Sequence, residues 1–198
     1  EGLVESSDLL QRRRLPEGRV DYAAVVAFKR RLLEKACRRF RQQMPDTGYE
    51  RFCGENAFWI DDYALFSALS AHHTDITWDR WPPKARYRSP MEIRRLRREL
   101  HDPIEHLKVE QYLFYRQWLS LRSYCREKCI HLFGDLPIYV PFHSADVWAH
   151  RQLFKLDRFY RPLVVSGVPP DYFSADGQLW GHPVYNWENH RQMRYDWW

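Results

Sequence analysis

The sequence lacks the glycine patterns with which proteins bind nucleotide phosphates. It has 8 glycines in 198 residues, and none of them forms a Gly-x-Gly-x-x-Gly or a Gly-x-x-x-x-Gly-Lys motif. A Gly-x-Ser-x-Gly turn and a His-Glu-x-x-His helix are missing as well. These absences remove the commonest signatures of nucleotide binding, of serine hydrolysis and of zinc-dependent proteolysis.

Long apolar runs and ordered cysteine patterns are missing too. No stretch approaches the length of a transmembrane helix, and the first residues lack the apolar core of a signal peptide. The cysteines, Cys37, Cys53, Cys125 and Cys129, match neither a zinc ribbon nor a Cys-x-x-Cys redox pair, and Cys125 and Cys129 lack two further ligands nearby in sequence. We therefore expect reduced, packed thiols in a cytoplasmic protein without a membrane partner.

Basic residues outnumber acidic ones by 31 to 26, which gives a formal net charge of +5. The excess gathers in four clusters: Arg12-Arg13-Arg14, Lys29-Arg30-Arg31, Arg38-Arg39 and Arg94-Arg95 with Arg97-Arg98. A basic surface could attract nucleic acid, but no nucleic-acid motif accompanies these clusters. We interpret them as solvated helix faces and expect no nucleic-acid partner; a salt-sensitive affinity for DNA or RNA would support the opposite hypothesis.

The first two thirds of the chain have helical periodicity. Asp21 is placed to cap a helix that runs to about Met44, and a second helix, apolar on most sides, is predicted from Phe52 to Ser70. Asp61 and Asp62 lie inside that second helix, so we expect them to pair with arginine. Asp102-Pro103 marks the start of the longest helix.

The last third mixes short segments with turns. Residues 130–133 have the character of a short buried strand, and Asp135 follows it directly. An acid just past a buried strand that follows a long helix is typical of the mouth of a (β/α)8 barrel. Ser144 is placed to cap a short helix, 145–149.

Residues 167–181 combine turn formers with three large aromatics and show neither a helix nor a strand period. We predict a long ordered loop, a feature that is usually functional in compact domains. Aromatic rings on such a loop suit sugars, whose C–H faces pack on rings while their hydroxyls need polar neighbours. Asp171, Ser174 and Gln178 are interleaved with the rings, although Asp171 could simply hold the turn.

These segments together resemble the amylomaltase family of 4-alpha-glucanotransferases. The resemblance extends from about residue 20 to Trp198, and its motifs are Val20-Asp21-Tyr22, Phe52-Cys53, Trp59–Phe66, Gln117-Trp118, Leu121-Arg122, Gly134–Val140, Ser144–Ala149, Leu153–Asp157 and Gly167–Gly181. The resemblance implies an α/β fold, here part of a (β/α)8 barrel that is mostly helical, with a helical insertion and a long sugar-binding loop. It divides the chain into a helical insertion at 1–128 and a barrel strand with a glucan-binding segment at 129–198.

The resemblance also implies a substrate and a set of binding residues. Family members act without a metal or cofactor on alpha-1,4-glucans and maltooligosaccharides, by a retaining mechanism that needs two carboxylates about 5–5.5 Å apart. Asp135 matches an acid of the donor site, Tyr172 and Phe173 match loop aromatics that flank the glucan, and Gln178 and Trp180 match residues on the acceptor side. Three positions depart from the family pattern: His143, Asp176 and His182.

Neither catalytic motif of the family is present. The nucleophile belongs to an Arg-x-Asp-His-Phe-Arg-Gly motif and the acid/base to an Ala-Glu-Asp-Leu-Gly motif, whereas the Arg-x-Asp triplets here are Arg19-Val20-Asp21 and Arg194-Tyr195-Asp196. We therefore expect no catalytic residue in this chain, only substrate binding, and no transfer by the chain alone. A non-catalytic glucan-binding or interaction module derived from the same family is the alternative.

Overall fold

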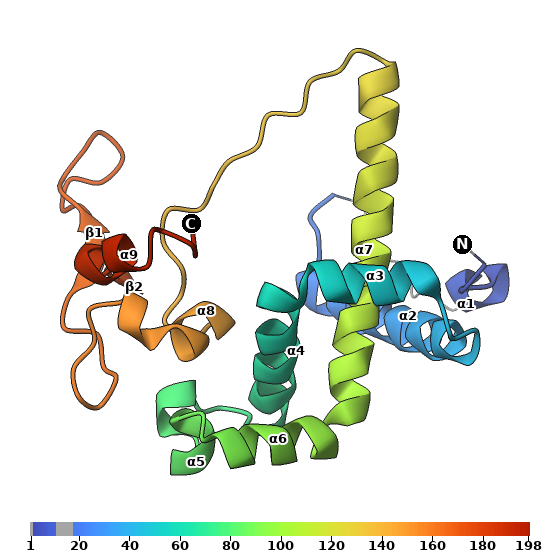
Figure 1. The fold of residues 1–198 in the computed structure, drawn as a ribbon. Helices are drawn as coiled ribbons and strands as arrows, with labels where there is room; N and C mark the ends of the chain where they lie inside the picture. The colour runs from blue at the N-terminus through green and yellow to red at the C-terminus, as the bar shows by residue number, and fades with distance from the viewer. Residues whose placement is uncertain (1, 11–17) are drawn as a thin grey trace. The chain divides into compact units, whose positions relative to one another are not determined.

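The computed structural model describes residues 2–10 and 18–198 (Figure 1). Two compact units make up the chain: unit 1 comprises Glu1–Ile60 and Asp102–Leu132, and unit 2 comprises Asp61–His101 and Phe133–Trp198. The basic cluster Arg12-Arg13-Arg14 lies outside the described residues. Within the described residues, no helix is both long enough and apolar enough to cross a membrane.

Unit 1 is built from helices whose apolar faces meet in one core. Its elements are α1 (Ser6–Leu10), α2 (Tyr22–Gln42), α3 (Thr47–Glu55) and most of α7 (His101–Glu127). The predicted cap of α2 is confirmed, because Asp21 Oδ1 accepts a hydrogen bond from the Ala24 amide at 3.0 Å. Phe40, Tyr49 and Tyr112 pack ring against ring at 5.6–5.8 Å and join α2, α3 and α7.

The prediction of a single helix from Phe52 to Ser70 is wrong at one point, because α3 ends at Glu55 and α4 (Ala57–His72) begins after Asn56. The Asn56 carboxamide donates to the Phe52 carbonyl at 2.8 Å and accepts from the Trp59 indole at 2.9 Å. A short polar side chain that bonds to backbone in this way competes with helix continuation. The expected pairing is confirmed for Asp62, which lies 2.8 Å from Arg88.

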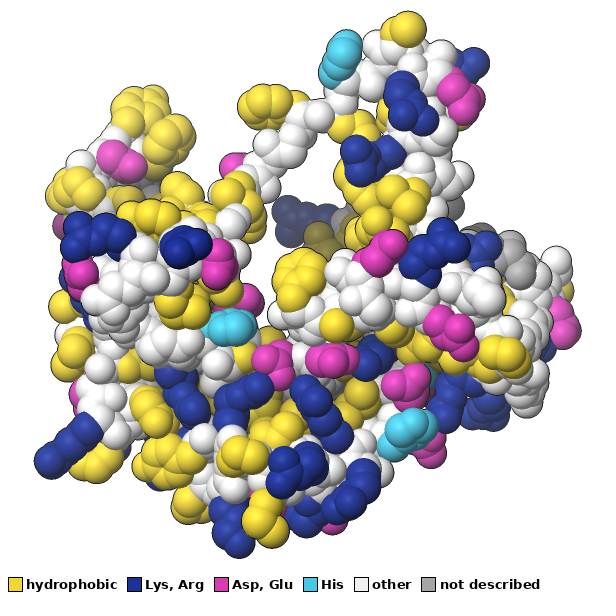
Figure 2. Space-filling view, viewed as in Figure 1, with side chains coloured by type: hydrophobic (Ala, Val, Ile, Leu, Met, Phe, Trp, Pro, Cys, Tyr) yellow, Lys and Arg dark blue, Asp and Glu magenta, His cyan; other side chains and the backbone are white. Residues whose placement is uncertain are grey.

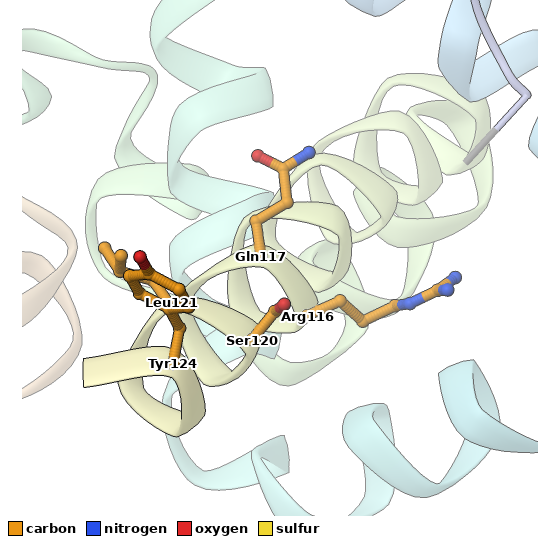
Figure 3. A pocket seen from close by; sticks show the side chains of 5 residues that line it. All are labelled: Arg116, Gln117, Ser120, Leu121 and Tyr124. Carbon is orange, nitrogen blue, oxygen red and sulfur yellow. The ribbon is translucent and has the colours of Figure 1, made fainter. Parts of the chain in front are cut away.

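The C-terminal half of α7 carries apolar side chains that face solvent. Phe114, Trp118 and Leu121 are exposed. Beside them is a shallow hollow of about 580 Å³ in the surface of the helix (Figure 3), lined by Arg116, Gln117, Ser120, Leu121 and Tyr124. The predicted long helix is therefore present, but in its C-terminal half most of the apolar stripe, Cys125 excepted, is not covered by the described part of the chain.

Unit 2 consists of short elements around a tryptophan-rich core. They are η1 (Trp78–Arg80), α5 (Pro83–Arg86), α6 (Pro90–Glu99), α8 (Ala145–Ala149), η2 (Arg151–Leu153), β1 (Val165–Val168), β2 (Gln178–Pro183) and α9 (Trp187–Gln192), with most of α4. Phe66, Trp81 and Trp148 pack at 5.4–5.8 Å between ring centroids. As predicted, Ser144 caps α8 by accepting a hydrogen bond from the Val147 amide.

Basic side chains gather over α5 and α6 on the face shown in Figure 2, with acidic side chains among them. Arg94, Arg95, Arg97 and Arg98 of α6 are exposed. Arg95 bridges Glu92 and Glu99 on the same helix at 2.6 and 2.5 Å. The arrangement is that of a solvated helix face with internal ion pairs, as the sequence indicated for this cluster.

The buried strand predicted at residues 130–133 is absent. Residues 130–137 carry no strand, and all of them are exposed. A strand is stable only when its amide and carbonyl groups are paired with a neighbouring strand. Among the described residues, residues 131–137 share no backbone hydrogen bond with another segment, so they form an extended, solvated connection. The four cysteines are free thiols, as expected, but the expectation that they are packed is wrong for Cys129, which is exposed.

Acidification is expected to destabilise unit 2. The pKa values of four histidines in this unit are lowered, and burial is the largest cause in each case. The four are His73, His143, His150 and His190. The folded state then favours the neutral imidazole, whereas the unfolded chain takes up protons near the ordinary value of about 6.5. Their contribution to stability is therefore complete above about pH 6.5 and is lost as the pH falls below it.

Urea unfolding followed by tryptophan fluorescence at about pH 7.5 and pH 5 measures this effect. The unfolding midpoint should be lower at pH 5. Carboxylates with lowered pKa values, such as Asp8 and Glu92, lose their contribution only below their ordinary values near pH 4, outside this window. An equal or higher midpoint at pH 5 would show that the buried histidines do not control acid stability.

Candidate functional site

Residues 167–181, which carry three large aromatic side chains, belong to a β-hairpin with a nine-residue loop. β1 pairs antiparallel with β2, and Gly167 and Val168 lie opposite Leu179 and Gln178. The prediction of an unbroken loop over 167–181 is therefore wrong at both ends, and the loop spans 169–177. The register shifts between Val165 and Gly167, which breaks the alternation of side chains that identifies a strand in sequence.

Two glycines allow the backbone segments of the hairpin to approach each other closely. A Cβ atom on Gly167 would lie 2.7 Å from the Gln178 carbonyl oxygen on the facing strand. Gly177 has a φ of +74°, and a Cβ atom there would lie 2.5 Å from the Val168 carbonyl oxygen. Since neither position tolerates a side chain without movement of the backbone, the two glycines fix where the loop leaves and rejoins the strands.

Asp171 organises the tip of the loop. Its Oδ1 atom accepts hydrogen bonds from the Phe173 amide at 2.9 Å and the Ser174 amide at 2.8 Å. The Ser174 hydroxyl in turn donates to the Gly177 carbonyl at 2.6 Å. Asp171 therefore holds the turn, which is the simpler of the two roles that the sequence left open for it.

The turn presents Tyr172 and Phe173 to solvent. Their side chains are 96% and 87% exposed, and the two rings meet edge to face at 5.5 Å and 87°. Burial of large aromatic side chains is strongly favourable, so it is unusual for an ordered turn to hold two rings this far out in solvent. Two rings at nearly a right angle offer one flat face and one edge.

Gln178 and Trp180 lie two residues apart on β2, so their side chains are on the same face of the strand. The Trp180 indole donates to Gln178 Oε1 at 3.1 Å, and the indole remains 45% exposed. Because Oε1 accepts this bond, the amino group of Gln178 is the part of the carboxamide that can donate to a ligand hydroxyl. The pair thus combines a ring face with an oriented polar group.

Two tyrosines that sequence reasoning did not select connect this hairpin to the segment after Asp135. Tyr139 contacts the Trp180 ring edge to face at 6.4 Å and stacks on Tyr185 at 5.8 Å. The Tyr185 hydroxyl donates to the Ile138 carbonyl at 2.8 Å. Only their aromatic type marked them in the sequence, because the contacts join positions 40 to 50 residues apart.

Asp135 is exposed, and no hydrogen bond described in the structure joins it to the hairpin. It lies three residues before Ile138, so its backbone is within about 11 Å of the Ile138 backbone. The structure thus brings Gln178 together with Trp180 and Tyr172 together with Phe173. It places Asp135 in the neighbouring segment, and no hydrogen bond described in the structure joins Asp135 to either pair.

His143 is a structural residue rather than a ligand-facing one. Its Nδ1 atom accepts a hydrogen bond from the Trp78 amide at 3.1 Å, which places the proton on Nε2, 3.3 Å from the Ser70 hydroxyl. The ring also packs on Phe66 at 5.0 Å. The departure from the family pattern at this position is therefore accommodated by packing, and the neutral imidazole is the form that these bonds require.

The structure is similar to that of an amylomaltase. It matches the amylomaltase from Streptococcus agalactiae in complex with acarbose with a TM-score of 0.90 and 38% sequence identity, over 100% of this chain and 40% of that chain. At this level of likeness the fold class is clear: the chain has the mostly helical architecture of part of a (β/α)8-barrel enzyme, as the sequence predicted.

The sequence comparisons identify the family. A family model described as 4-alpha-glucanotransferase matches residues 1–198. The 4-alpha-glucanotransferases of Aquifex aeolicus and Thermus thermophilus are each 40% identical to this chain, over 100% and 92% of its length. The chain belongs to the 4-alpha-glucanotransferase family. It spans about two fifths of the length of these relatives, 39% and 37% respectively.

Proposed function

We propose that this chain is the glucan-binding segment of a 4-alpha-glucanotransferase and that its ligands are alpha-1,4-linked glucans. The exposed ring pair Tyr172–Phe173 on its ordered turn is the observation that carries this proposal. A glucose unit has flat C–H faces that pack on aromatic rings and equatorial hydroxyls that need polar partners. Trp180 and Gln178 supply a second ring with such a partner beside it.

The transfer reaction itself is assigned to the complete enzyme. A retaining mechanism needs a carboxylate nucleophile and an acid/base carboxylate about 5–5.5 Å apart. In this sequence the two Arg-x-Asp triplets do not have the family's nucleophile motif, and Asp21 of the first is the N-cap of α2. In the complete enzyme, Asp135 would contribute a carboxylate to the donor site, and the hairpin would hold the glucan.

The two parts of the chain then have different roles. Residues 129–198 contain the hairpin and the Asp135 segment, and we assign glucan binding to them. Residues 1–128 contain the helices of unit 1 together with α4, α5 and α6, and we assign them to the helical insertion of the enzyme. This functional boundary differs from the boundary of the compact units, because residues 61–101 pack with 133–198 in unit 2.

The chain of 198 residues is expected not to transfer glucose units. When it is incubated with maltotriose, product analysis by anion-exchange chromatography should show neither glucose nor longer oligosaccharides. The Aquifex aeolicus relative, assayed in parallel, serves as the positive control. Formation of glucose and maltopentaose by this chain, lost in an Asp135→Asn variant, would show that the catalytic machinery is contained in it.

A non-catalytic glucan-binding module remains the alternative, and the departures at Asp176 and His182 are the observations that favour it. Asp176 is exposed in the loop, and His182 lies half-buried on β2. The coding sequence that follows Trp198 separates the two functions. An Arg-x-Asp-His-Phe continuation supports the enzyme, and a stop codon supports the module.

A further inference from the structure

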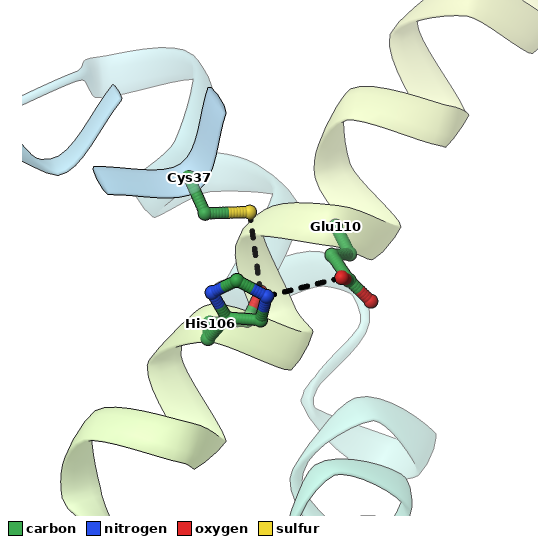
Figure 4. A group of neighbouring side chains, drawn as sticks. All are labelled: Cys37, His106 and Glu110. Atoms are coloured by element: carbon green, nitrogen blue, oxygen red, sulfur yellow. Dashed lines mark hydrogen bonds and ion pairs between the residues drawn. The ribbon is translucent and has the colours of Figure 1, made fainter. Parts of the chain in front are cut away.

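Three potential metal ligands meet between two helices of unit 1, away from the hairpin in sequence and function. Cys37 comes from α2, and His106 and Glu110 come from α7 (Figure 4). One ligand atom of each residue lies within 4.8 Å of those of the other two. His106 Nε2 is 3.1 Å from Glu110 Oε1, and Cys37 Sγ is 3.8 Å from the His106 carbonyl oxygen.

We propose that Cys37, His106 and Glu110 form a binding site for a thiophilic divalent cation, with Zn²⁺ as the ion that best fits the donor set and with water as the fourth ligand. Sulfur, imidazole nitrogen and carboxylate oxygen are the donors that Zn²⁺ takes from proteins. Ca²⁺ and Mg²⁺ require oxygen ligands throughout, so the thiol and the imidazole disfavour them.

The geometry needs one small movement. Zinc bond lengths of about 2.0–2.2 Å to N and O imply an N···O separation of about 3.4 Å in a tetrahedral site, and the observed 3.1 Å is close to it. A zinc–sulfur bond of about 2.3 Å implies an S···N separation of about 3.6 Å, so Cys37 Sγ, which lies within 4.8 Å, must approach by about 1.2 Å at most. A change of side-chain torsion on one helix supplies such a shift.

The position of the two α7 ligands follows from the helix period. His106 and Glu110 are four residues apart, and residues at this spacing lie on one face of a helix. Cys37 is fully buried, whereas the His106 and Glu110 side chains are 29% and 25% exposed. The site therefore has a buried thiol at its base and an opening toward solvent, which leaves room for a water ligand.

The charges of the site balance when the ion is bound. The Cys37 thiol loses its proton to solvent as the Zn–S bond forms. His106 Nε2, which donates to Glu110 when no ion is bound, also gives up its proton, and the neutral imidazole then carries its proton on Nδ1. The thiolate and the Glu110 carboxylate then neutralise the two positive charges of the ion. Arg41 lies near enough to oppose a cation, but its own charge is paired with Asp102 at 2.7 Å.

The consequence is a cross-link between α2 and α7 inside the core of unit 1. Cys37 belongs to the same buried cluster as Phe40, Val109 and Leu113. A bound ion stabilises the folded state according to its affinity and concentration. The sequence did not indicate the site, because its ligands lie 69 and 73 positions from Cys37. Nothing in the proposal concerns catalysis, for which we expect no metal.

Cobalt substitution tests the site directly. One equivalent of Co²⁺ added to the reduced, metal-free chain should give the intense visible bands of tetrahedral cobalt together with a thiolate-to-cobalt charge-transfer band in the near ultraviolet. One equivalent of Zn²⁺ should abolish both. Zinc at about 100 times its Kd should raise the unfolding midpoint by about 5–10 °C, and EDTA should reverse the shift.

Matched variants decide which residues bind. Cys37→Ser should remove the charge-transfer band, and His106→Gln should weaken cobalt binding at least about tenfold, whereas Cys129→Ser and His131→Gln in the same unit should leave both unchanged. If the buried Cys37→Ser variant does not fold, His106→Gln carries the comparison. The proposal is overturned if the parent chain shows no charge-transfer band. It is also overturned if the band survives His106→Gln at full affinity and is lost in Cys129→Ser.

Discussion

The double substitution Tyr172→Ala and Phe173→Ala should lower the affinity of the chain for maltoheptaose by about tenfold to a hundredfold. Each ring is almost fully exposed, so its loss removes ligand contact area and little packing. Truncation of a binding hot spot, a role for which aromatic residues are enriched, costs about 2 kcal/mol or more of binding free energy, and about 1.4 kcal/mol corresponds to a factor of ten. Isothermal titration calorimetry with maltoheptaose measures the change.

Phe58→Ala is the matched control for this effect. Phe58 is 79% exposed on α4 and lies outside the hairpin. It should leave the affinity for maltoheptaose unchanged, and the thermal midpoints of all the variants should agree within about 2 °C. Unchanged affinity in the double variant would mean that the ring pair does not contact the glucan.

Replacing Trp148 with alanine should destabilise the chain by about 3–5 kcal/mol. The Trp148 side chain is fully buried among Phe66 and Trp81. Its indole donates to the Ala85 carbonyl at 3.2 Å, and the Arg88 guanidinium lies 4.2 Å from the ring centroid. The substitution leaves a cavity, an unpaired carbonyl and a cation without its ring, and each of these raises the free energy of the folded state.

Chemical denaturation of the two-unit chain measures the loss for Trp148→Ala, with Trp118→Ala as its control. Trp118 is 39% exposed on α7, so its removal should cost about 1 kcal/mol or less. The loss expected for Trp148→Ala is a large part of the roughly 5–15 kcal/mol that stabilises a typical domain. Equal effects of the two substitutions would contradict the assignment of Trp148 to the core of unit 2.

Local signals in the sequence were sufficient where one side chain decides the structure. Asp21 and Ser144 cap their helices through their own hydrogen bonds, and Asp62 finds the arginine partner that a half-buried carboxylate needs. These outcomes depend on residues close by or on charge alone. They are therefore visible without knowledge of the fold.

Predictions failed where a distant segment decides the structure. Residues 130–133 have strand-like character, but no other described segment pairs with them, and the side chain of Phe133 is fully exposed. The hairpin was missed because its bulge breaks the alternation and its outward face carries apolar residues such as Leu179.

The candidate site was predictable in type and incomplete in arrangement. Rings and polar side chains on one segment indicated sugar binding, but the four hairpin residues were named through the resemblance to the amylomaltase family, and the structure places them in two pairs. The link through Tyr139 and Tyr185 could not be named, since it joins residues far apart in the chain. The Cys37 cluster on α2 and α7 is hidden for the same reason.

The most direct test of the central claim is a fluorescence titration of this 198-residue chain with maltoheptaose and, separately, with the β-1,4-linked cellohexaose. Trp180 is half-exposed on β2 beside Gln178, so a glucan that covers the ring should change its emission. We predict a saturable change with maltoheptaose that is lost in Trp180→Ala, and a much weaker response to cellohexaose. No saturable response to maltoheptaose, or equal responses to the two glucans, would contradict the assignment of this chain as an alpha-glucan-binding segment.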